Sequence, residues 1–148
     1  MEFVKNAFII TLLVIISSSS SAVTSANNND EKIGGIFVWP TRVQIFNNLN
    51  DEVQLTVHCR SGDDDLGAHV LASNQEYEFK FRINFTGTTL YSCSLTWIGG
   101  TGSYQLFKAS RDSDRCASKC VWRAHNDGIY GFKEGRNQTK ADIIYKWT

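Results

Sequence analysis

The fold is decided by residues 55–67, which read LTVHCRSGDDDLG. Apolar Leu55, Val57 and Cys59 alternate with polar residues, and the alternation stops in an acidic turn that contains glycine. Side chains of a β-strand alternate between its two faces, so we expect Cys59 on a buried face, within reach of a partner on a facing strand. His58 should point the other way. The stretch therefore predicts a strand that carries one cysteine into the core and then turns sharply.

The same alternation recurs along the chain. Residues 76–82 alternate aromatic with charged side chains, and residues 89–97 place Cys93 and Trp97 on one face. Turn residues separate such segments about every eight to twelve positions, and no segment keeps a helical period. The sequence predicts an all-β fold, an antiparallel β-sandwich of about eight short strands stapled by disulfides.

Two hairpins are expected from the turn chemistry. The first joins residues 42–46 to residues 53–60 through a polar turn. The second joins residues 121–125 to residues 129–132 through Asn126, Asp127 and Gly128. The glycine-rich residues 99–102 are expected to be another turn, between two strands.

Composition describes one globular domain. The chain has 148 residues, of which 42% are hydrophobic, with 15 basic and 15 acidic side chains and a sequence pI near 6.8. Balanced charge gives no electrostatic footprint for nucleic acid or an anionic membrane. We therefore expect partners among proteins, glycans or small ligands, no nucleic acid partner, and a monomer.

The N-terminus predicts secretion. Lys5 precedes an apolar run at residues 7–16 and a serine-rich segment, with cleavage expected after one of the residues from Ala22 to Ala26. The apolar run is too short for a membrane span, which needs roughly 20 residues, so we expect an extracellular protein with no stable membrane insertion. The expected division is a signal peptide at residues 1–26, an N-terminal leader at residues 27–41 and a domain at residues 42–148.

Secretion makes disulfides the expected state of the four cysteines, Cys59, Cys93, Cys116 and Cys120. Four cysteines allow three connectivities. We favour Cys59 with Cys93 and Cys116 with Cys120, which would contribute about 4 and about 2 kcal/mol by loop closure. A cross pairing between the two sets is the alternative.

Metal sites are weakly indicated. Cys116, Cys120 and His125 have a tolerable spacing for zinc, but a fourth ligand is not evident. The acidic residues 63–65 lack the spacing of a calcium loop and suit a turn whose carboxylates bond their own backbone. We expect no metal and no cofactor.

An enzyme would have to use His58, His69 and His125, the three histidines of the chain. Two of them could act as acid and base in a secreted hydrolase. The sequence has neither a nucleophile elbow nor a phosphate-cradling glycine loop. We expect no catalytic residues.

Two sequons predict N-glycosylation in loops. They begin at Asn84, in Asn84-Phe85-Thr86, and at Asn137, in Asn137-Gln138-Thr139.

Four motifs in order give the chain a likeness to a known family. HCRSGDDDLG begins at His58, YEFKF at Tyr77, NFTGTTLYSC at Asn84 and CVWRAHNDGIY at Cys120. Between Arg42 and Trp147 the chain resembles the plant self-incompatibility S1 family, the S-protein homologues. The resemblance implies a small secreted plant β-sandwich with disulfides, and it transfers no catalytic residue. The matching positions are structural: Cys59, residues 63–67, Phe79, Cys93, Trp97, Cys120, Trp122, Asp127 and Gly128.

The function expected from secretion, scaffold and resemblance is that of a non-enzymatic apoplastic signalling ligand for a cell-surface receptor, with self-incompatibility or pollen–pistil recognition as the process. A glycan-binding or defence-related module is the alternative, through exposed aromatics such as Trp39 or Tyr104. A secreted hydrolase is a third hypothesis. Loops usually carry binding residues, and the candidate loops are residues 61–65, 98–103, 110–119 and 134–140.

Overall fold

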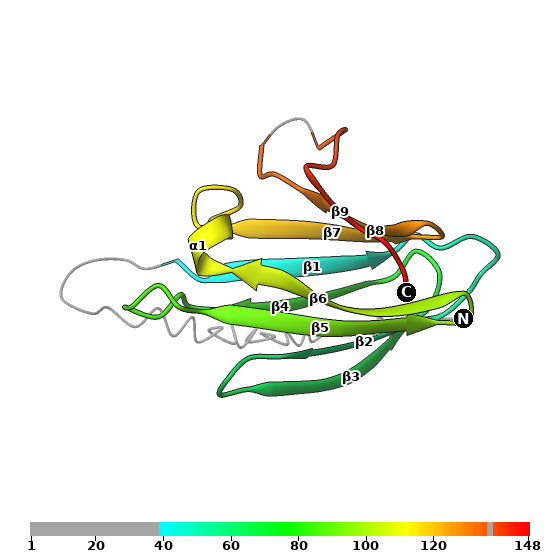
Figure 1. Cartoon of the computed structure of the whole chain (residues 1–148), viewed down its shortest axis with the longest axis horizontal. Coiled ribbons are helices and arrows are strands. Elements are labelled where there is room, and N and C mark those ends of the chain that lie inside the picture. Colours follow the sequence, from blue (N-terminus) through cyan, green and yellow to red (C-terminus); the bar gives the residue numbers. More distant parts are fainter. Residues whose placement is uncertain (1–38, 136–137) are drawn as a thin grey trace, which may run out of the picture.

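The structure is a computed structural model that describes residues 39–135 and 138–148. Within these residues nine strands form two sheets that pack on one another (Figure 1). The signal peptide, most of the leader and Asn137 lie outside the described residues. The five-stranded sheet contains, in spatial order, β4 (Glu76–Phe81), β1 (Thr41–Asn47), β7 (Lys119–His125), β8 (Gly128–Phe132) and β9 (Ile143–Tyr145).

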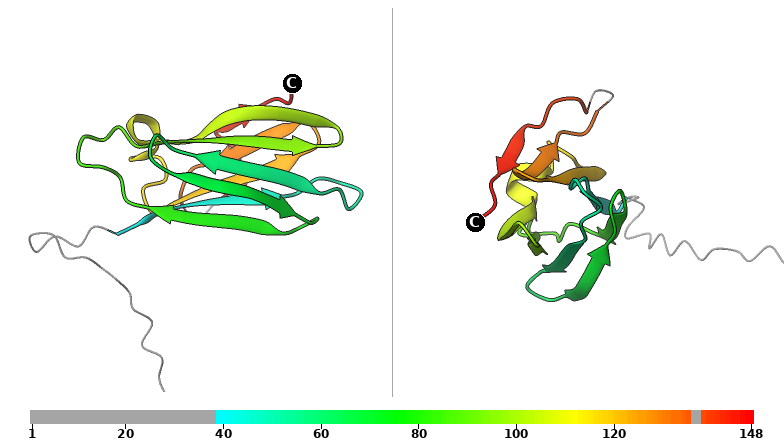
Figure 2. Two further views of the ribbon diagram at one scale, coloured as in Figure 1. Left: turned by 90° about the horizontal axis from the view of Figure 1, so that it is seen from below. Right: turned by 90° about the vertical axis from the view of Figure 1, so that its right-hand side faces the viewer.

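The second sheet packs on the first and completes the β-sandwich that the alternation of apolar and polar residues predicted, as the two views of Figure 2 show. One short helix, α1 (Ala109–Asp112), directly follows the last strand of this second sheet along the chain. All neighbouring strands are antiparallel except β1 and β7, which run parallel. The four-stranded sheet contains, in spatial order, β3 (Asp65–Leu71), β2 (Leu55–Arg60), β5 (Leu90–Trp97) and β6 (Gly100–Lys108).

The core lies between the sheets and is built from the alternating apolar residues. Val43 and Ile45 of β1 and Leu55, Val57 and Cys59 of β2 have no exposed surface. Fully burying an aliphatic side chain of this size stabilises the fold by about 1.5–3 kcal/mol. In β1 and β2 the period of two in the sequence therefore indicates correctly which face of the strand is buried.

Aromatic rings close the core at the end where β4 stops and β5 begins. The Phe81 ring lies 4.5 Å from that of Tyr91 and 4.7 Å from that of Phe107, centroid to centroid. Phe79 also contacts Tyr91, at 5.0 Å. These rings come from both sheets, so they fix the ends of β4, β5 and β6 relative to one another.

The first predicted hairpin is wrong, because β1 does not pair with β2. β1 lies between β4 and β7, whereas β2 belongs to the other sheet. Asn47, which is fully buried, explains the crossing: its side-chain amide donates to the carbonyls of Val53 and Leu71, and its Oδ1 accepts from the N–H of Leu49. These bonds satisfy backbone groups where the chain passes between sheets. The second predicted hairpin is correct, since β7 and β8 pair antiparallel.

Cys59 and Cys93 are bonded to each other, but within one sheet. β2 and β5 are neighbours, and the two cysteines lie directly opposite with their Cα atoms 4.0 Å apart. We expected Cys59 to reach a facing strand, and that geometry is wrong. Both sulfurs still point into the core, because both residues are fully buried.

Residues 99–102 are not all a turn, because β6 already begins at Gly100. A Cβ atom at Gly102 would lie 1.9 Å from the Tyr104 hydroxyl, and one at Gly100 would lie 2.8 Å from the Cβ of Trp147. These glycines therefore make room for aromatic side chains against the strand.

Candidate functional site

Three connections lie at the same end of the sandwich, which we call the loop end: the β2–β3 turn, the β4–β5 loop and the segment from α1 to β7 (Figure 1). The first two enclose a recess of about 570 Å³. Its lining is polar and carries both signs of charge. The residues are Arg60, Ser61, Gly62, Asp63, Asp64, Arg82, Asn84, Thr88, Thr89, Leu90, Tyr91 and Ser92.

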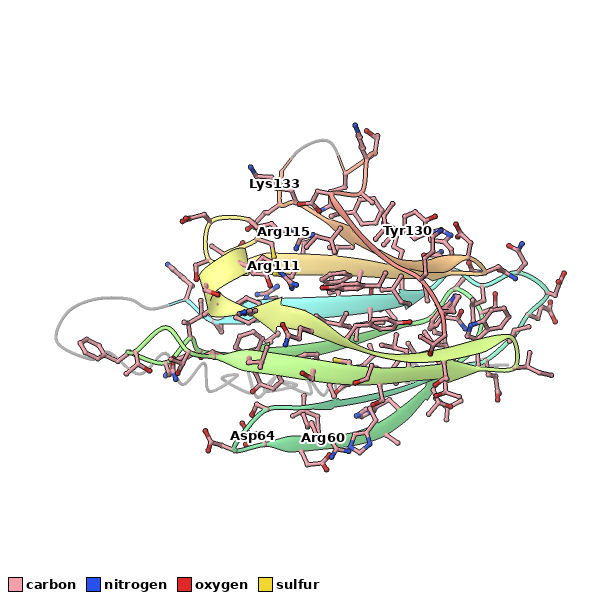
Figure 3. All side chains as sticks on the ribbon, viewed as in Figure 1. Arg60, Asp64, Arg111, Arg115, Tyr130 and Lys133 are labelled. Carbon is pink, nitrogen blue, oxygen red and sulfur yellow. A yellow bond between two sulfur atoms is a disulfide. The ribbon has the colours of Figure 1, made fainter. Side chains whose placement is uncertain are left out.

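The β2–β3 turn is held by its own polar groups. The Ser61 hydroxyl accepts hydrogen bonds from the N–H groups of Asp63 and Asp64, at 3.3 and 3.0 Å. Asp65 bonds His58 and also accepts from the N–H of Gly67. The His58 hydrogen bond and then that of Gly67 lower the pKa of Asp65. The turn thus presents Asp63 and Asp64 to solvent, and Figure 3 shows Asp64 at its tip.

Tyr91 connects this turn to the floor of the recess. Its hydroxyl donates to Asp64 Oδ2 at 3.4 Å, and its ring is buried against the aromatic core. Burial raises the pKa of the Tyr91 hydroxyl, and the nearby carboxylate of Asp64 adds to that effect. The tyrosine is therefore neutral and positioned by packing.

The β4–β5 loop forms the opposite wall. Sequence reasoning considered this loop only for its sequon and missed it as a binding loop. It folds on Thr88, whose N–H donates to Asn84 Oδ1 at 2.8 Å and whose hydroxyl accepts from Asn84 Nδ2 at 2.7 Å. Arg82 lies at the start of the loop, and Phe85 at its tip is fully exposed. Their proximity to residues 61–64 is a long-range feature that no local pattern signals.

A smaller recess of about 260 Å³ extends the surface toward α1. It shares Thr88, Thr89 and Leu90 with the larger recess and is also lined by Lys108 and Ser110. A backbone hydrogen bond from the N–H of Ala109 to the carbonyl of Thr89 joins the two segments. The three connections consequently form one continuous surface.

The predicted binding loop at residues 110–119 is only partly exposed. Asp112 is fully buried and accepts from the Lys108 N–H and from the guanidinium groups of Arg111 and Arg115. Arg115 continues to Asp142 through two bonds of 2.6 and 2.7 Å. Figure 3 shows Arg111, which belongs to α1, and Arg115, which follows the helix. Part of this segment therefore serves packing, which its charged composition did not suggest.

Cys116 lies in that segment, and Cys120 follows it in β7. They are bonded to each other and fully buried. Their sulfurs are therefore not zinc ligands beside His125. In the described part of the chain, no three His, Cys, Asp or Glu side chains are grouped so that they could hold a metal ion.

Glu134, the first residue of the candidate segment at residues 134–140, adjoins the loop end. Glu134 accepts hydrogen bonds from the N–H and the hydroxyl of Ser118. A groove of about 300 Å³ lies beside this contact, between Glu134, Lys119 and Trp39, and 71% of the Trp39 side chain is exposed.

The candidate loop at residues 98–103 lies at the opposite end. Tyr104, which follows it, is half-buried: its ring stacks on Tyr145 at 5.1 Å, and its hydroxyl donates to the Lys146 carbonyl. Tyr104 is thus not the exposed aromatic that a sugar-stacking role requires. Trp39 is exposed, as a role in stacking on sugars would require.

The three histidines do not form an acid and base pair. His58 bonds Asp65 on the outer face of β2, and His69 stacks on Tyr77 at 3.9 Å. His125 belongs to the other sheet, and burial lowers its pKa.

The fold and the site together define a small disulfide-bonded β-sandwich that presents a recessed polar loop surface. Residues 42–147 match the family model described as plant self-incompatibility protein S1. The chain belongs to this family, and it is an S-protein homologue.

Relatives from two plants share most of the domain. S-protein homolog 24 of Arabidopsis thaliana is 43% identical over 108 residues, covering 72% of this chain and 69% of that protein. S-protein homolog 6 of the same plant is 44% identical over 108 residues, covering 72% and 76%. Self-incompatibility protein S1 of Papaver rhoeas is 39% identical over 94 residues, covering 62% and 68%.

A solved structure of SPH (self-incompatibility protein homologue) proteins has the same fold. It superposes with a TM-score of 0.59 at 21% identity, covering 74% of this chain and 96% of that chain. Those proteins are described as a widespread family of small, highly stable, secreted proteins from plants. Secretion of the family agrees with the location predicted from the N-terminal segment. Among the residues described, no helix is long and apolar enough to cross a membrane.

Proposed function

We propose that this S-protein homologue is a non-enzymatic extracellular ligand that binds a cell-surface receptor through its loop end. The observation that carries the proposal is that three connections, far apart in sequence, meet around one continuous surface, whose larger recess is lined by polar and charged residues. Loops held on a rigid scaffold are where proteins usually carry binding residues. The two disulfides and the aromatic core hold this surface in place before a partner arrives.

The chemistry of the recess favours a protein partner with charges of both signs. Arg60 and Arg82 lie on the same surface as Asp63 and Asp64. Such mixed charge selects a partner by complementarity and contributes more to specificity than to raw affinity. We propose that the ligand acts as a monomer.

Binding of fluorescently labelled protein to plant plasma membranes tests the proposal. We expect saturable binding that weakens about tenfold when the charges at the recess are reversed in Arg60→Glu or Asp64→Arg. Glu52→Lys is the matched control, because Glu52 is exposed in the β1–β2 loop at the opposite end (Figure 1). Absence of saturable binding in every tissue that expresses or adjoins the protein would reject the receptor role. Equal losses in all three variants would reject the loop end.

We propose self-incompatibility or pollen–pistil recognition as the process, because one relative is named a self-incompatibility protein. Growth of pollen tubes with added protein is the assay. Unchanged growth of tubes from every pollen genotype tested would reject this role and leave receptor binding to be judged separately.

A glycan-binding module is the second candidate, favoured by the exposed Trp39 beside its groove with Lys119. An exposed indole ring can stack on the apolar face of a sugar. Saturable binding on a glycan array that is lost in Trp39→Ala and kept in Phe85→Ala would favour this candidate, since Phe85 is also exposed but lies elsewhere.

A further inference from the structure

Asn84 begins a tight turn that holds its side chain in place. The carbonyl of Asn84 accepts a hydrogen bond from the N–H of Gly87 at 2.9 Å, and Gly87 has a φ of +66°. Asparagine at the first position and glycine at the fourth are the preferred residues of such a turn. Phe85 therefore stands at the tip, where its side chain is fully exposed.

Thr88 fixes the orientation of the Asn84 amide. Oδ1 of Asn84 accepts from the Thr88 N–H, and Nδ2 donates to the Thr88 hydroxyl, which also bonds the Thr86 hydroxyl at 3.0 Å. An asparagine amide has two N–H donors. One of them can be replaced by a glycosidic bond while the other keeps the contact with Thr88.

The amide lies at the mouth of the larger recess. Asn84 and Thr88 line it, together with Arg60 and Arg82. A branched sugar at this position would stand beside the recess and cover the exposed ring of Phe85, because N-glycans are bulky and remain at the protein surface.

We propose that Asn84 carries an N-linked glycan whose first sugars lie over Phe85 and the mouth of the recess, so that occupancy of this sequon controls which partners enter it. Attachment forms a C–N bond between Nδ2 and the first sugar of a lipid-linked oligosaccharide. The bond from that sugar to the lipid pyrophosphate breaks, and the amide proton leaves with the pyrophosphate. The control of partners rests on the proposed function, whereas the glycan and its position do not.

Three proteins secreted from plant cells test this proposal, each with Thr139→Val to remove the second sequon. The first keeps the Asn84 sequon. The second, Thr86→Val, loses the sequon but keeps both bonds between Asn84 and Thr88. The third, Thr88→Val, keeps the sequon and loses the hydroxyl that orients the amide.

Peptide mapping by mass spectrometry gives the occupancy, and phenylglyoxal, which modifies arginine, reports access to the recess. We expect glycan at Asn84 in the first and third proteins. Arg60 and Arg82 should react at least about threefold more slowly in the first protein than in Thr86→Val, since the bulky glycan stands at the mouth. Thr88→Val should fall between them. Arg42, which is exposed and does not line the recess, should react equally in all three.

An unmodified Asn84 in the first protein would overturn the proposal. So would equal reactivity of Arg60 and Arg82 in the glycosylated protein and in Thr86→Val, or a parallel change at Arg42. A protein that binds plasma membranes saturably but lacks a glycan at Asn84 would retain the receptor role and lose this inference alone.

Discussion

At the residue scale, the most consequential side chains are polar groups that the core encloses. Asn47 satisfies backbone groups at two of the crossings between the sheets, from β1 to β2 and from β3 to β4. Asp112 is enclosed by Arg111 and Arg115. A buried polar group stabilises the fold only while its partners are complete. These residues therefore specify the path of the chain more than they add to its core.

Asn47→Leu should lower the free energy of unfolding by about 3 kcal/mol, because two carbonyls and one N–H would lose their partner inside the core. Urea denaturation followed by tryptophan fluorescence measures the change. Asn50→Ala, in the exposed part of the same connection, should stay within about 0.5 kcal/mol of the wild type. Equal effects of the two substitutions would contradict the role of Asn47.

Asp142 should make stability depend on pH. Burial acts to raise its pKa, but the hydrogen bonds and charge of Arg115 outweigh burial, so the pKa lies below its ordinary value of 3.8. A carboxyl whose pKa is lowered on folding contributes stability above its unfolded pKa and loses it as the pH falls through the folded value. Wild-type protein should lose stability below about pH 4 more steeply than Asp142→Asn, as measured by denaturation at a series of pH values. Identical slopes would show that Asp142 is not the titrating group.

At the scale of elements, glycines decide where strands approach one another. Gly128 begins β8 with a φ of +157°, and a Cβ atom there would lie 2.2 Å from the Tyr145 carbonyl oxygen of β9. The sequence identified Gly128 as a turn residue. It did not reveal that the missing side chain of Gly128 also leaves room for the backbone of β9, because β9 is distant in sequence.

Gly128→Ala should lower the free energy of unfolding by about 2–4 kcal/mol, since the methyl group meets backbone that cannot move without breaking β8–β9 pairing. Thermal unfolding measures the loss. Gly62→Ala is the control, because a Cβ atom there meets nothing within 4 Å. A Gly128→Ala protein as stable as Gly62→Ala would mean that β9 is readily displaced.

At the scale of the whole molecule, the sequence predicted the strands well and their pairing poorly. Alternation is local, so the buried faces of residues 55–59 and 91–97 could be read directly. Which sheet receives β1 depends on Asn47 and on β7, far along the chain. The recess was missed for the same reason, since Arg60, Arg82 and Asn84 meet only in the fold.

The two disulfides should contribute unequally to the whole fold. Cys59 and Cys93 are 34 residues apart, and Cys116 and Cys120 are 4 apart. Loop-closure entropy predicts a loss of about 4 kcal/mol for Cys59→Ala with Cys93→Ala and about 2 kcal/mol for Cys116→Ala with Cys120→Ala. Guanidinium denaturation of the two double variants measures the difference. A reversed order would mean that the short loop contributes mainly by packing around α1.

The parallel pairing of β1 with β7 has a consequence for biosynthesis. The Thr41 hydroxyl donates to the carbonyl of Ala117, a residue 76 positions later and just before β7, so β1 enters the secretory pathway long before the strand that pairs with it. Contacts this distant form slowly and leave apolar strands uncovered in the meantime. Both cysteines of the first disulfide precede β7, and we expect that bond to close first, while chaperones of the endoplasmic reticulum still hold β1.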